Sequence, residues 1–453
     1  MNLDYWESKK LQPDTFYPSS DQSIALERSF ARDMPSIVQN PFKRFEDIRA
    51  WQFQRIQYLV KLAYNNIPIY HKKYSSLGLN PNDVKSWDDF YRLPIITKDE
   101  LIEAFPHSCV DYSRFNESDL FATRSTGSSG RTVKIRVDFD AIVRDTLQGV
   151  RQYYLQSGLR YKQNHNVALI YTVPWWFRSI GEEYKTYFIS SLIKNDKISS
   201  ILRGINPQII SCYPSNLRSL LPYIKDLENL YLVIVHSEQS SKLERDRWSK
   251  ELGIPILDEY SSEEATRIAL EFPCGHYHIC EDTVYLESIN PNTMQHQTPG
   301  KPGWTIVTNL LNEAMPFIRY FQGDLITLPE QPDNCLINWG QIQAIEGRAN
   351  DSFKTLDGRE ICSGTLLDIT YRWMYDLQVN IREFKLVQKS YTNIDIVIEP
   401  EQDISKDVLL NKSIPHLKKL LEKTFGYELN LNVMFVKRFD HKKKKRFIQS
   451  DIS

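Results

Sequence analysis

Apolar residues recur at helical spacing in the stretch between Phe45 and Asn66. The members of this apolar face are Ile48, Trp51, Ile56, Leu59, Val60 and Ala63. Residues three and four apart share a helix face, so this spacing predicts a helix, which should stop at Pro68. Further on, Thr97 precedes Glu100 by three residues, which is a capping-box pattern that predicts the start of another helix.

Between Asn164 and Leu257 the pattern alternates between short apolar runs and helical segments. The runs VALIY, IISCY and LYLVIV have the length of strands, and PSNLRSLLPYI and SSKLERDRWSKEL have helical character. Strands that alternate with helices favour a mainly parallel sheet whose faces are covered by helices. The sequence therefore predicts an α/β fold class.

The pattern changes after Glu281. Shorter runs, DTVYLESI, GWTIVTNL and FIRYF, predict an antiparallel, barrel-like subdomain over about residues 281–347. From about Ala349, TLDGREI carries the Asp-Gly turn of a hairpin, and further strand-like runs and a helix follow it. We predict a large N-terminal domain over residues 1–348 and a small α+β C-terminal domain over residues 349–453.

Composition narrows the class of protein. Of the 453 residues, 41% are apolar and 25% are charged, as in an ordinary globular chain. The 56 basic and 57 acidic residues give a net charge of −1, so no global field attracts nucleic acid or an anionic membrane. The six cysteines are too scattered for a disulfide scaffold, the first residues lack a signal-peptide pattern, and no apolar run approaches the roughly 18 residues that span a bilayer. We expect a cytoplasmic protein without membrane insertion or a nucleic-acid partner.

The first candidate for chemistry lies between Arg124 and Arg131. This run consists of Ser125, Thr126, Gly127, Ser128, Ser129 and Gly130. Hydroxyls and backbone N–H groups in such a run can converge on phosphate oxygens, so one interpretation is a phosphate-binding loop. The run is not a Walker A loop, because no Gly-Lys-Ser/Thr follows at the required spacing. The other interpretation is a surface turn, since Gly/Ser runs are common in loops.

Three later segments accompany this loop. They are Asp258–Glu264, then Met315–Tyr320 followed by Gly323 and Asp324, and then Ile345–Arg348. With these motifs in this order, the chain resembles the acyl-adenylate-forming superfamily, and specifically the phenylacetate-CoA ligase-like branch that includes adenylating proteins of capsular-polysaccharide biosynthesis. The resemblance extends from about Trp51 to Ser450.

The resemblance implies a two-step reaction that uses ATP. A carboxylate attacks the α-phosphorus of ATP and releases pyrophosphate, and a nucleophile, commonly the thiol of coenzyme A, then takes the acyl group from the acyl-AMP. Because an anion must approach a triphosphate, the site must neutralise negative charge.

The resemblance also implies roles for individual residues. The loop from Ser125 to Gly130 would hold the β- and γ-phosphates, and Glu264 would act in catalysis by helping to hold Mg²⁺. Asp324 would accept hydrogen bonds from the ribose hydroxyls, with Arg348 as a donor beside it. Further neighbours of the nucleotide would be Ser237, Glu238, Glu259 and Tyr260. The residue after Tyr260 is Ser261, where the family usually has glycine.

The run Lys442–Lys445 has two interpretations. In the family a lysine near the C-terminus reaches the α-phosphate and the acyl carboxylate, and the ending RF-x-x-S aligns Lys444 with it. The usual Ser-Gly pair before it is replaced by two lysines, so Lys443 or Lys445 could substitute. The other interpretation is a solvated tail or a basic patch for nucleic acid or lipid. The resemblance further implies a mobile C-terminal domain that turns about Asn350.

A group of cysteines and histidines raises the question of a metal. Some members of the branch carry a structural zinc here, and the candidate ligands in this chain are Cys274, His276, Cys280 and Cys335. Alternate side chains of a strand lie about 6 to 7 Å apart, which is too far for adjacent ligands unless the chain turns at Gly275. Free thiols and a core histidine are the alternative.

The acyl pocket is the least readable part of the site. Thr172–Phe177, with Tyr213 and Pro214, would suit an aromatic or short planar acid, although aromatic side chains more often form core. We predict an AMP-forming acid–thiol ligase that activates a small carboxylic acid, with an aromatic acid as one option. The alternatives are a catalytically degenerate adenylate-binding protein in a polysaccharide or secondary-metabolite pathway, and an adenylating enzyme that serves a carrier protein or an amine.

Overall fold

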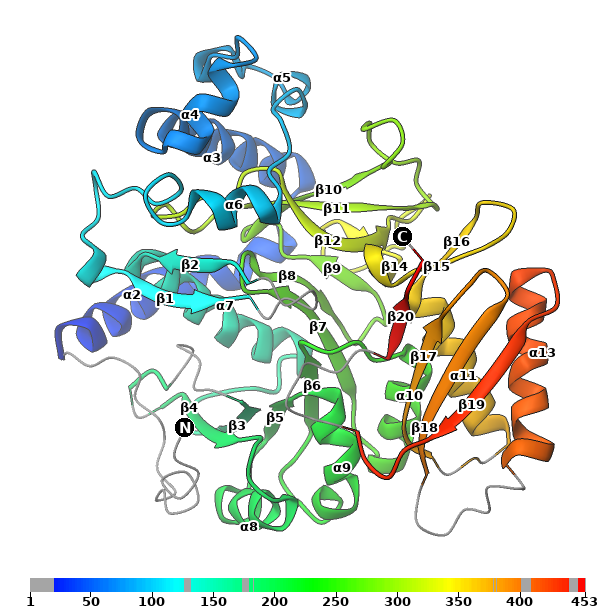
Figure 1. Cartoon of the computed structure of the whole chain (residues 1–453). Coiled ribbons are helices and arrows are strands. Elements are labelled where there is room, and N and C mark those ends of the chain that lie inside the picture. Colours follow the sequence, from blue (N-terminus) through cyan, green and yellow to red (C-terminus); the bar gives the residue numbers. More distant parts are fainter. Residues whose placement is uncertain are drawn as a thin grey trace.

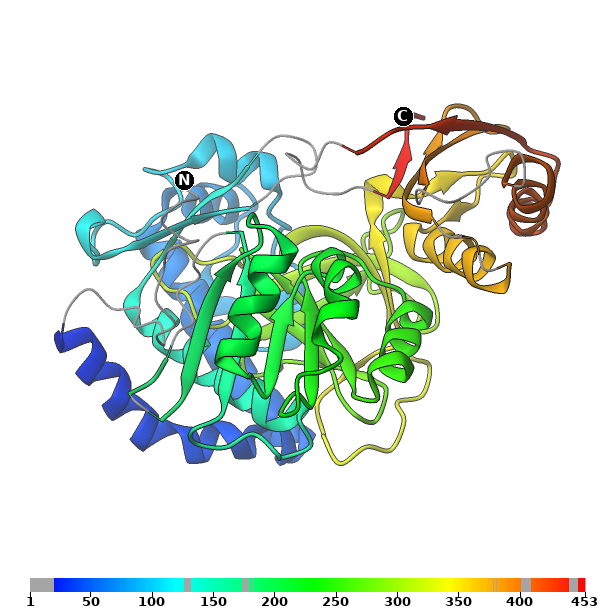
Figure 2. The same ribbon diagram turned by 90° about the horizontal axis from the view of Figure 1, so that it is seen from below.

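The computed structural model describes residues 20–125, 132–172, 179–181, 183–377, 379, 381–400, 409–439 and 447–452. Figure 1 shows a large body, which holds the elements up to β14, and a smaller part, which holds the C-terminal strands and helices. Figure 2 shows this C-terminal part to one side of the body, beside the strand β14 that leads into it. None of the helices in these ranges is long and apolar enough to cross a membrane.

Helices form the first segment of the body. They are α2 (Ser20–Gln39), α3 (Phe45–Asn66), α4 (Pro68–Ser75), α5 (Trp87–Tyr91) and α6 (Lys98–Ala104), with short 3-10 turns η1 (Asn40–Phe42), η2 (Pro81–Asp83) and η3 (Glu117–Asp119). Helix α3 ends before Pro68, as predicted, and α4 begins at that proline, because the first turn of a helix tolerates a missing N–H. The predicted capping box is present, since Thr97 and Glu100 each accept a hydrogen bond from the other's backbone N–H.

An eight-stranded sheet with the order β13-β9-β8-β7-β6-β5-β3-β4 forms the centre of the body. Its strands are β3 (Asn166–Tyr171), β4 (Lys185–Ser190), β5 (Ile209–Cys212), β6 (Leu232–His236), β7 (Ile256–Ser262), β8 (Thr266–Glu271), β9 (Tyr277–Ile279) and β13 (Gln341–Ile342). The five strands from β7 to β4 are parallel, and β8, β9 and β13 continue the sheet in antiparallel fashion.

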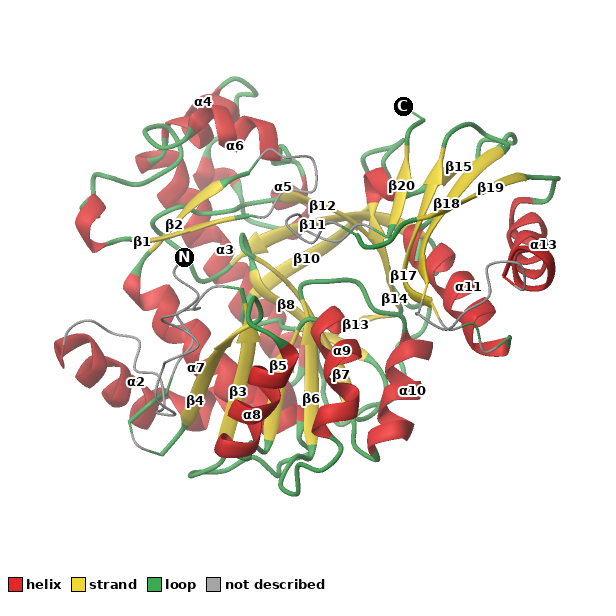
Figure 3. Cartoon of the chain, turned by 60° about the horizontal axis from the view of Figure 1, so that its bottom comes forward, coloured by secondary structure: helices red, strands yellow, loops and turns green. Residues whose placement is uncertain are grey.

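Helices cover both faces of this sheet. On one face lie α8 (Asn195–Ile205), α9 (Pro214–Ile224) and α10 (Lys242–Leu252), and on the other lies α7 (Phe139–Gln156) (Figure 3). Strand β6 serves both layers: Val233 and Val235 join the apolar cluster of α8 to α10, whereas Leu232 and Ile234 join the cluster that contains α7. The predicted α/β fold with a helix-covered parallel sheet is confirmed.

Two smaller antiparallel sheets complete the body. One has the order β10-β11-β12-β14, and the other is a hairpin of β1 and β2. Their bounds are β10 (Val284–Ile289), β11 (Pro302–Asn309), β12 (Tyr320–Thr327), β14 (Ala344–Arg348), β1 (Phe121–Arg124) and β2 (Lys134–Val137). The antiparallel pairing agrees with the prediction for this region. The described strands form an open sheet with β10 and β14 at its edges, where we predicted a barrel-like arrangement.

The C-terminal part has its own apolar core. Its elements are η4 (Ala349–Asp351), β15 (Phe353–Lys354), β16 (Glu360–Ile361), α11 (Ser363–Asp376), β17 (Ile381–Gln388), β18 (Asn393–Pro400), η5 (Leu409–Ser413), α13 (Ile414–Phe425), β19 (Asn430–Phe435) and β20 (Ile448–Ser450). Strands β19-β18-β17-β20 form one sheet, and the apolar cluster around the fully buried Trp373 runs from Phe353 to Ile448. The predicted Asp-Gly hairpin is the β15–β16 pair.

Candidate functional site

A large cavity opens where the parallel strands of the eight-stranded sheet end. Its volume is about 2500 Å³. The segments after β5 and β6 reach it through Tyr213 and Ser237, and β7 reaches it through Glu259. Ligands of α/β sheets bind at this edge, outside the carboxyl ends of the strands. Ser363 and Phe384 of the C-terminal part also line the cavity, so both parts of the molecule face the same space.

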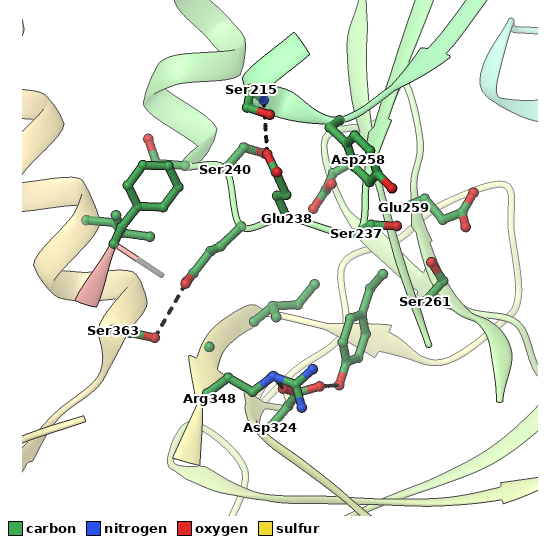
Figure 4. Close-up of a pocket in the computed structure, with 18 of the residues that line it drawn as sticks. Ser215, Ser237, Glu238, Ser240, Asp258, Glu259, Ser261, Asp324, Arg348 and Ser363 are labelled. Carbon is green, nitrogen blue, oxygen red and sulfur yellow. Dashed lines mark hydrogen bonds and ion pairs between the residues drawn. The ribbon is translucent and has the colours of Figure 1, made fainter. Parts of the chain in front are cut away.

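Three of the predicted site residues meet at Asp324. The hydroxyl of Tyr260 donates to Asp324 Oδ2 over 2.8 Å, and Arg348 Nε lies 3.0 Å from Oδ1 (Figure 4). Strands β12 and β14 hold Asp324 opposite Arg348 in their register. The Asp324 carboxylate raises the pKa of Arg348, and burial together with this carboxylate raises the pKa of Tyr260. We call these three residues the Asp324 group; it presents a buried carboxylate, which suits a pair of neighbouring hydroxyls.

Gly347 brings the C-terminal part close to this group. Its φ is +95°, and a Cβ atom at this position would lie 1.9 Å from Ser363 Oγ. Any other residue would therefore be strained in its backbone and would clash with the start of α11. The Gly-Arg pair of the sequence motif thus combines a close backbone approach at Gly347 with a charged contact at Arg348.

The strands β1 and β2 flank the predicted phosphate loop in sequence, and their described residues reach the large cavity. Arg124 pairs with Lys134 in the register of the hairpin, and both side chains line the cavity. The hydroxyl of Ser125 accepts a hydrogen bond from the backbone N–H of Val133 over 3.0 Å, which closes the base of the loop. Residues Thr126–Gly130 lie outside the described part of the chain. The described base of the loop carries two cations, as binding of a polyphosphate requires.

Glu264 follows β7 in the chain and is only 6% exposed. Its Oε1 accepts a hydrogen bond from the hydroxyl of Tyr320 over 3.1 Å. The neighbouring Glu263 instead accepts a hydrogen bond from Thr123 of β1. Both carboxylates line a second pocket next to the cavity, and carboxylate oxygens near phosphates are the donors that Mg²⁺ prefers. The oxygen donors present thus fit a magnesium ion.

Ser237 and Glu238 form a tight turn after β6. Ser237 has a φ of +67°, which residues with a side chain rarely adopt, and the N–H of Glu238 donates to the carbonyl of His236. The carboxylate of Glu238 accepts a hydrogen bond from the N–H of Ser215, at the start of α9, where the helix dipole favours an anion. In Figure 4 this turn lies across from the Asp324 group.

We call the second pocket the inner pocket. It has a volume of about 160 Å³ and shares Ser125, Ser237, Glu259 and Arg348 with the large cavity. Its other walls among the described residues come from α6, α7 and the strands β3, β5, β6, β7, β8 and β12. The aromatic segment from residue 173 to 177, which we predicted as a wall for the acid, lies outside the described residues.

The sequence prediction misses a row of buried polar residues on α7. Asp145, Gln148, Gln152 and Gln156 are each at most 3% exposed. They recur at intervals of three or four residues, so a polar stripe at helical spacing was the available signal. Arg267 of β8 joins them, because it forms an ion pair with Asp145 and donates to Gln152.

Two further predicted residues lie wholly or partly outside the description. Lys444 belongs to the segment 440–446, which the structure does not describe, and of Asn350 only the backbone is described. The described residues on either side of that segment, Phe439 and Phe447, both line the large cavity.

Cysteine and histidine side chains gather beside β9. The ligand atoms of Cys274, His278 and Cys335 all lie within 4.8 Å of one another, and His276 Nδ1 lies 3.3 Å from Cys335 Sγ. A turn at Gly275, with a φ of +85°, precedes this strand and brings Cys274 near His278. Our prediction of Cys280 as a ligand is not supported, because that thiol is fully buried in an apolar cluster two residues beyond His278.

Comparison with known proteins gives sequence relatives of one kind. No protein-family model matches the chain. The phenylacetate-coenzyme A ligase of Escherichia coli (strain K12) is 26% identical over 309 residues, which cover 62% of this chain and 68% of the relative. The protein of the same name from Aromatoleum evansii is 25% identical over 302 residues, covering 62% and 67%. That of Thermus thermophilus is 22% identical over 320 residues, covering 68% and 71%.

Solved structures show the same fold. The 2-hydroxyisobutyryl-CoA ligase in its postadenylation state, in complex with 2-HIB-AMP, has a TM-score of 0.75 at 18% identity, covering 91% of this chain and 92% of that chain. The same ligase in the thioesterification state, with 2-HIB-AMP and CoA, has a TM-score of 0.62 at 17% identity, covering 91% of each chain. The motifs, the sequence relatives and the fold agree: they support a place for the chain in the acyl-adenylate-forming superfamily, near the phenylacetate-coenzyme A ligases to which its sequence is similar.

Proposed function

We propose that this protein is an AMP-forming acid–thiol ligase, which activates a small carboxylic acid with ATP and transfers the acyl group to coenzyme A. The observation that carries the proposal is the Asp324 group on the same cavity as the base of the phosphate loop. Binding of a nucleoside triphosphate needs one group that binds the ribose and another that binds the phosphates, both facing the same cavity.

The first step has a simple balance of bonds. A carboxylate oxygen of the acid forms a bond to the α-phosphorus of ATP, and the bond from that phosphorus to the pyrophosphate oxygen breaks. We assign the ribose hydroxyls to Asp324, with Arg348 and Tyr260 as the groups that hold this carboxylate in place. Arg124, Lys134 and the loop would offset the phosphate charge. When bound, Mg²⁺ would neutralise further phosphate charge, and Glu264 is the residue that we propose to hold it.

The second step needs another arrangement of the C-terminal part, which we propose to be a separate domain over residues 349–453 that turns at Asn350. In the thioester step, the thiolate of coenzyme A attacks the acyl carbon and AMP leaves. Support comes from the two TM-scores, 0.75 and 0.62, which one ligase gives in two states. A change in how the parts of that ligase are arranged would give such a difference, and the score of this chain is higher with the postadenylation state.

Lys444 is the residue that we propose to act on the α-phosphate during adenylation. Its segment begins and ends beside Phe439 and Phe447, which line the cavity. A lysine is a compact cation on a flexible stem, and such a group suits a charge that must reach the site only in one arrangement of the domains. Coenzyme A is the acceptor that we favour, since the curated relatives are named as coenzyme A ligases. The carrier-protein, amine and degenerate alternatives gain no support from them.

We further propose a structural zinc ion at Cys274, His278 and Cys335, with His276 as the candidate fourth ligand. Two thiols and two imidazoles form a set that tetrahedral zinc commonly takes. Three of the four ligand atoms already lie within 4.8 Å of one another. Elemental analysis of the purified protein should find about one zinc per chain, and Cys335→Ser should lower this content. Zinc-free wild-type protein of normal stability would contradict the proposal.

The experiment that tests the main proposal is acid-dependent exchange of labelled pyrophosphate into ATP over a panel of carboxylic acids. Exchange with at least one acid, followed by formation of its coenzyme A thioester and AMP, is the expected result. Measurable ATP binding without exchange for every acid would overturn the proposal and favour a protein that only binds the nucleotide.

A further inference from the structure

The inner pocket is unusual in the polarity of its walls. Between α7 and β8, the buried side chains of Asp145, Gln152 and Arg267 line it, together with Glu259 and His236. Pockets for apolar acids are lined mainly by apolar and aromatic side chains with few polar groups. Because the inner pocket lies next to the nucleotide groups that we assigned, it is the space in which an acid that attacks the α-phosphate would lie.

The polar residues form one connected network. Gln152 accepts a hydrogen bond from Arg267 Nε over 2.6 Å and donates one to Glu259 Oε2 over 2.7 Å. Arg267 also pairs with Asp145, so two carboxylates share this wall with one guanidinium. Burial opposes ionisation of Glu259, but the charge of Arg267 and the bond from Gln152 keep its pKa below the usual value. The wall therefore carries one excess negative charge.

Three buried polar atoms of this pocket lack hydrogen-bond partners within the described part of the chain. They are His236 Nε2, Thr266 Oγ1 and Gln322 Oε1. His236 is 7% exposed; its Nδ1 contacts Ser237 Oγ over 2.9 Å, and burial lowers its pKa, so the ring is neutral near pH 7. A buried polar atom without a partner destabilises the fold, and a bound polar ligand would remove that penalty.

We propose that the acid activated by this enzyme is hydrophilic and carries a hydroxyl or ammonium group, which donates to Glu259 and contacts His236 at the end of the inner pocket. This inference rests on the proposed ligase function and names its substrate class. An unsubstituted phenyl ring or alkyl chain in the same place would leave the His236 nitrogen without a partner and would cover the Glu259 carboxylate without offering it a further donor. A ring that bears such a group satisfies the same contacts.

Pyrophosphate exchange with matched acids tests the proposal. Butanoate, 3-hydroxybutanoate and 3-aminobutanoate form one series, and phenylacetate, 4-hydroxyphenylacetate and 4-(aminomethyl)phenylacetate form another. We expect kcat/KM for at least one polar member to exceed that of its apolar parent by about tenfold or more. Equal or higher values for both apolar parents would overturn the inference. The hydroxyl and ammonium members show which of the two donors the pocket takes.

Two variants locate the effect in the inner pocket. Glu259→Gln keeps an acceptor for Gln152 but removes the charge, so the preference for the polar acid should shrink. His236→Phe keeps the ring contacts with Tyr171 and Tyr213, whose centroids lie 5.5 and 5.7 Å away, and removes both nitrogens. Asp324→Ala is the control, because it should lower exchange for all acids by a similar factor. An unchanged polar-to-apolar ratio in both pocket variants would overturn the inference.

A direct binding measurement separates this inference from the ligase function. Non-hydrolysable acyl-sulfamoyl adenosine analogues of each matched pair are titrated into the full-length protein by calorimetry. If no acid supports exchange but the polar analogue binds at least about tenfold more tightly, the ligase proposal fails and the substrate class stands. Equal binding, or tighter binding of the apolar analogue, overturns the substrate class whether or not exchange occurs.

Discussion

Arg218 of α9 donates a hydrogen bond to the hydroxyl of Tyr371 of α11, with 2.9 Å between Nη2 and the phenolic oxygen. The same guanidinium is paired with the buried Glu244 of α10. A charged group held by the body thus binds the C-terminal part, and it does so beside the cavity that both parts line. This contact would have to break if the C-terminal part turned for the thioester step.

Tyr371→Phe should weaken the described arrangement of the two parts. The loss of a hydrogen bond to a charged group costs about 1.5 to 3 kcal/mol, which is enough to shift a two-state equilibrium at least tenfold. Energy transfer between dyes on α13 and on the body should report a wider distance distribution. Tyr391→Phe, at an exposed tyrosine of the C-terminal part, is the control. The same distribution in both variants would rule out a role for this contact.

Asp324→Ala should weaken AMP binding by about 1 to 3 kcal/mol, because hydrogen bonds from the ribose to a charged acceptor are lost. Isothermal calorimetry with AMP measures the affinity directly. Asp357→Ala, at an exposed aspartate of the β15–β16 turn, should leave it unchanged. An unaltered affinity in the Asp324 variant would show that the ribose binds elsewhere.

Lys444→Ala should reduce acid-dependent pyrophosphate exchange by at least about a hundredfold, a scale typical for loss of a charged group that stabilises a transition state. Binding of ATP and the thiol step from supplied acyl-AMP should be largely retained. Lys443→Ala and Lys445→Ala are the matched controls. If one of them has the large effect in its place, the neighbouring lysine carries the role, and if none does, the basic run is a solvated tail.

Gly347→Ala should cost more stability than Gly358→Ala. Both glycines have a positive φ, but a Cβ at Gly358 meets nothing within 4 Å, whereas at Gly347 it would lie 1.9 Å from Ser363 Oγ. The Gly358 variant should lose only the stability that the positive φ costs, about 1 kcal/mol. At Gly347 the clash should lower the free energy of unfolding by about 1 to 3 kcal/mol more. Urea unfolding gives both values. Equal losses would mean that α11 shifts without cost.

Asp258 should make stability depend on pH. Burial raises its pKa to about 6, against an ordinary value of 3.8, despite the opposing charge of Arg245. The folded state therefore binds the Asp258 proton more tightly than the unfolded state does. The stability that this proton contributes is present below about pH 4 and is lost as the pH rises to about 6. Between these limits the free energy of unfolding should fall by up to about 3 kcal/mol relative to Asp258→Asn. Asp246→Asn, at an exposed position, should show no such difference, and a pH-independent difference for Asp258→Asn would contradict the shift.

The sequence was most informative where one residue type permits one local geometry. Pro68 and the Thr97–Glu100 pair predicted helix boundaries correctly, because a missing N–H and a reciprocal cap act within one turn. The alternation of runs predicted the parallel sheet, since strand and helix periods differ. Motif order predicted that Tyr260, Asp324 and Arg348 share one site, and the structure brings them into contact.

The sequence was least informative where contacts join distant strands. The neighbouring sequence does not show whether Cys280 or His278 joins the candidate zinc ligands. That depends on where the fold places Cys335, which lies 55 residues beyond Cys280. The polar row of α7 also escaped prediction, since we looked for aromatic runs and overlooked these residues. Their partner Arg267 lies 115 residues beyond Gln152, so the pair is invisible to any local pattern.

The chain of contacts from Asp145 through Arg267 and Gln152 to Glu259 couples substrate choice to folding. Asp145, Arg267 and Gln152 are buried, and each contacts the next residue of this row, so altering one alone removes a compensating contact from its neighbour. A change of substrate to an apolar acid would therefore require replacement of all four residues of this row together. Relatives that prefer such acids should differ from this chain at all four sites at once, and drift by single steps should be rare.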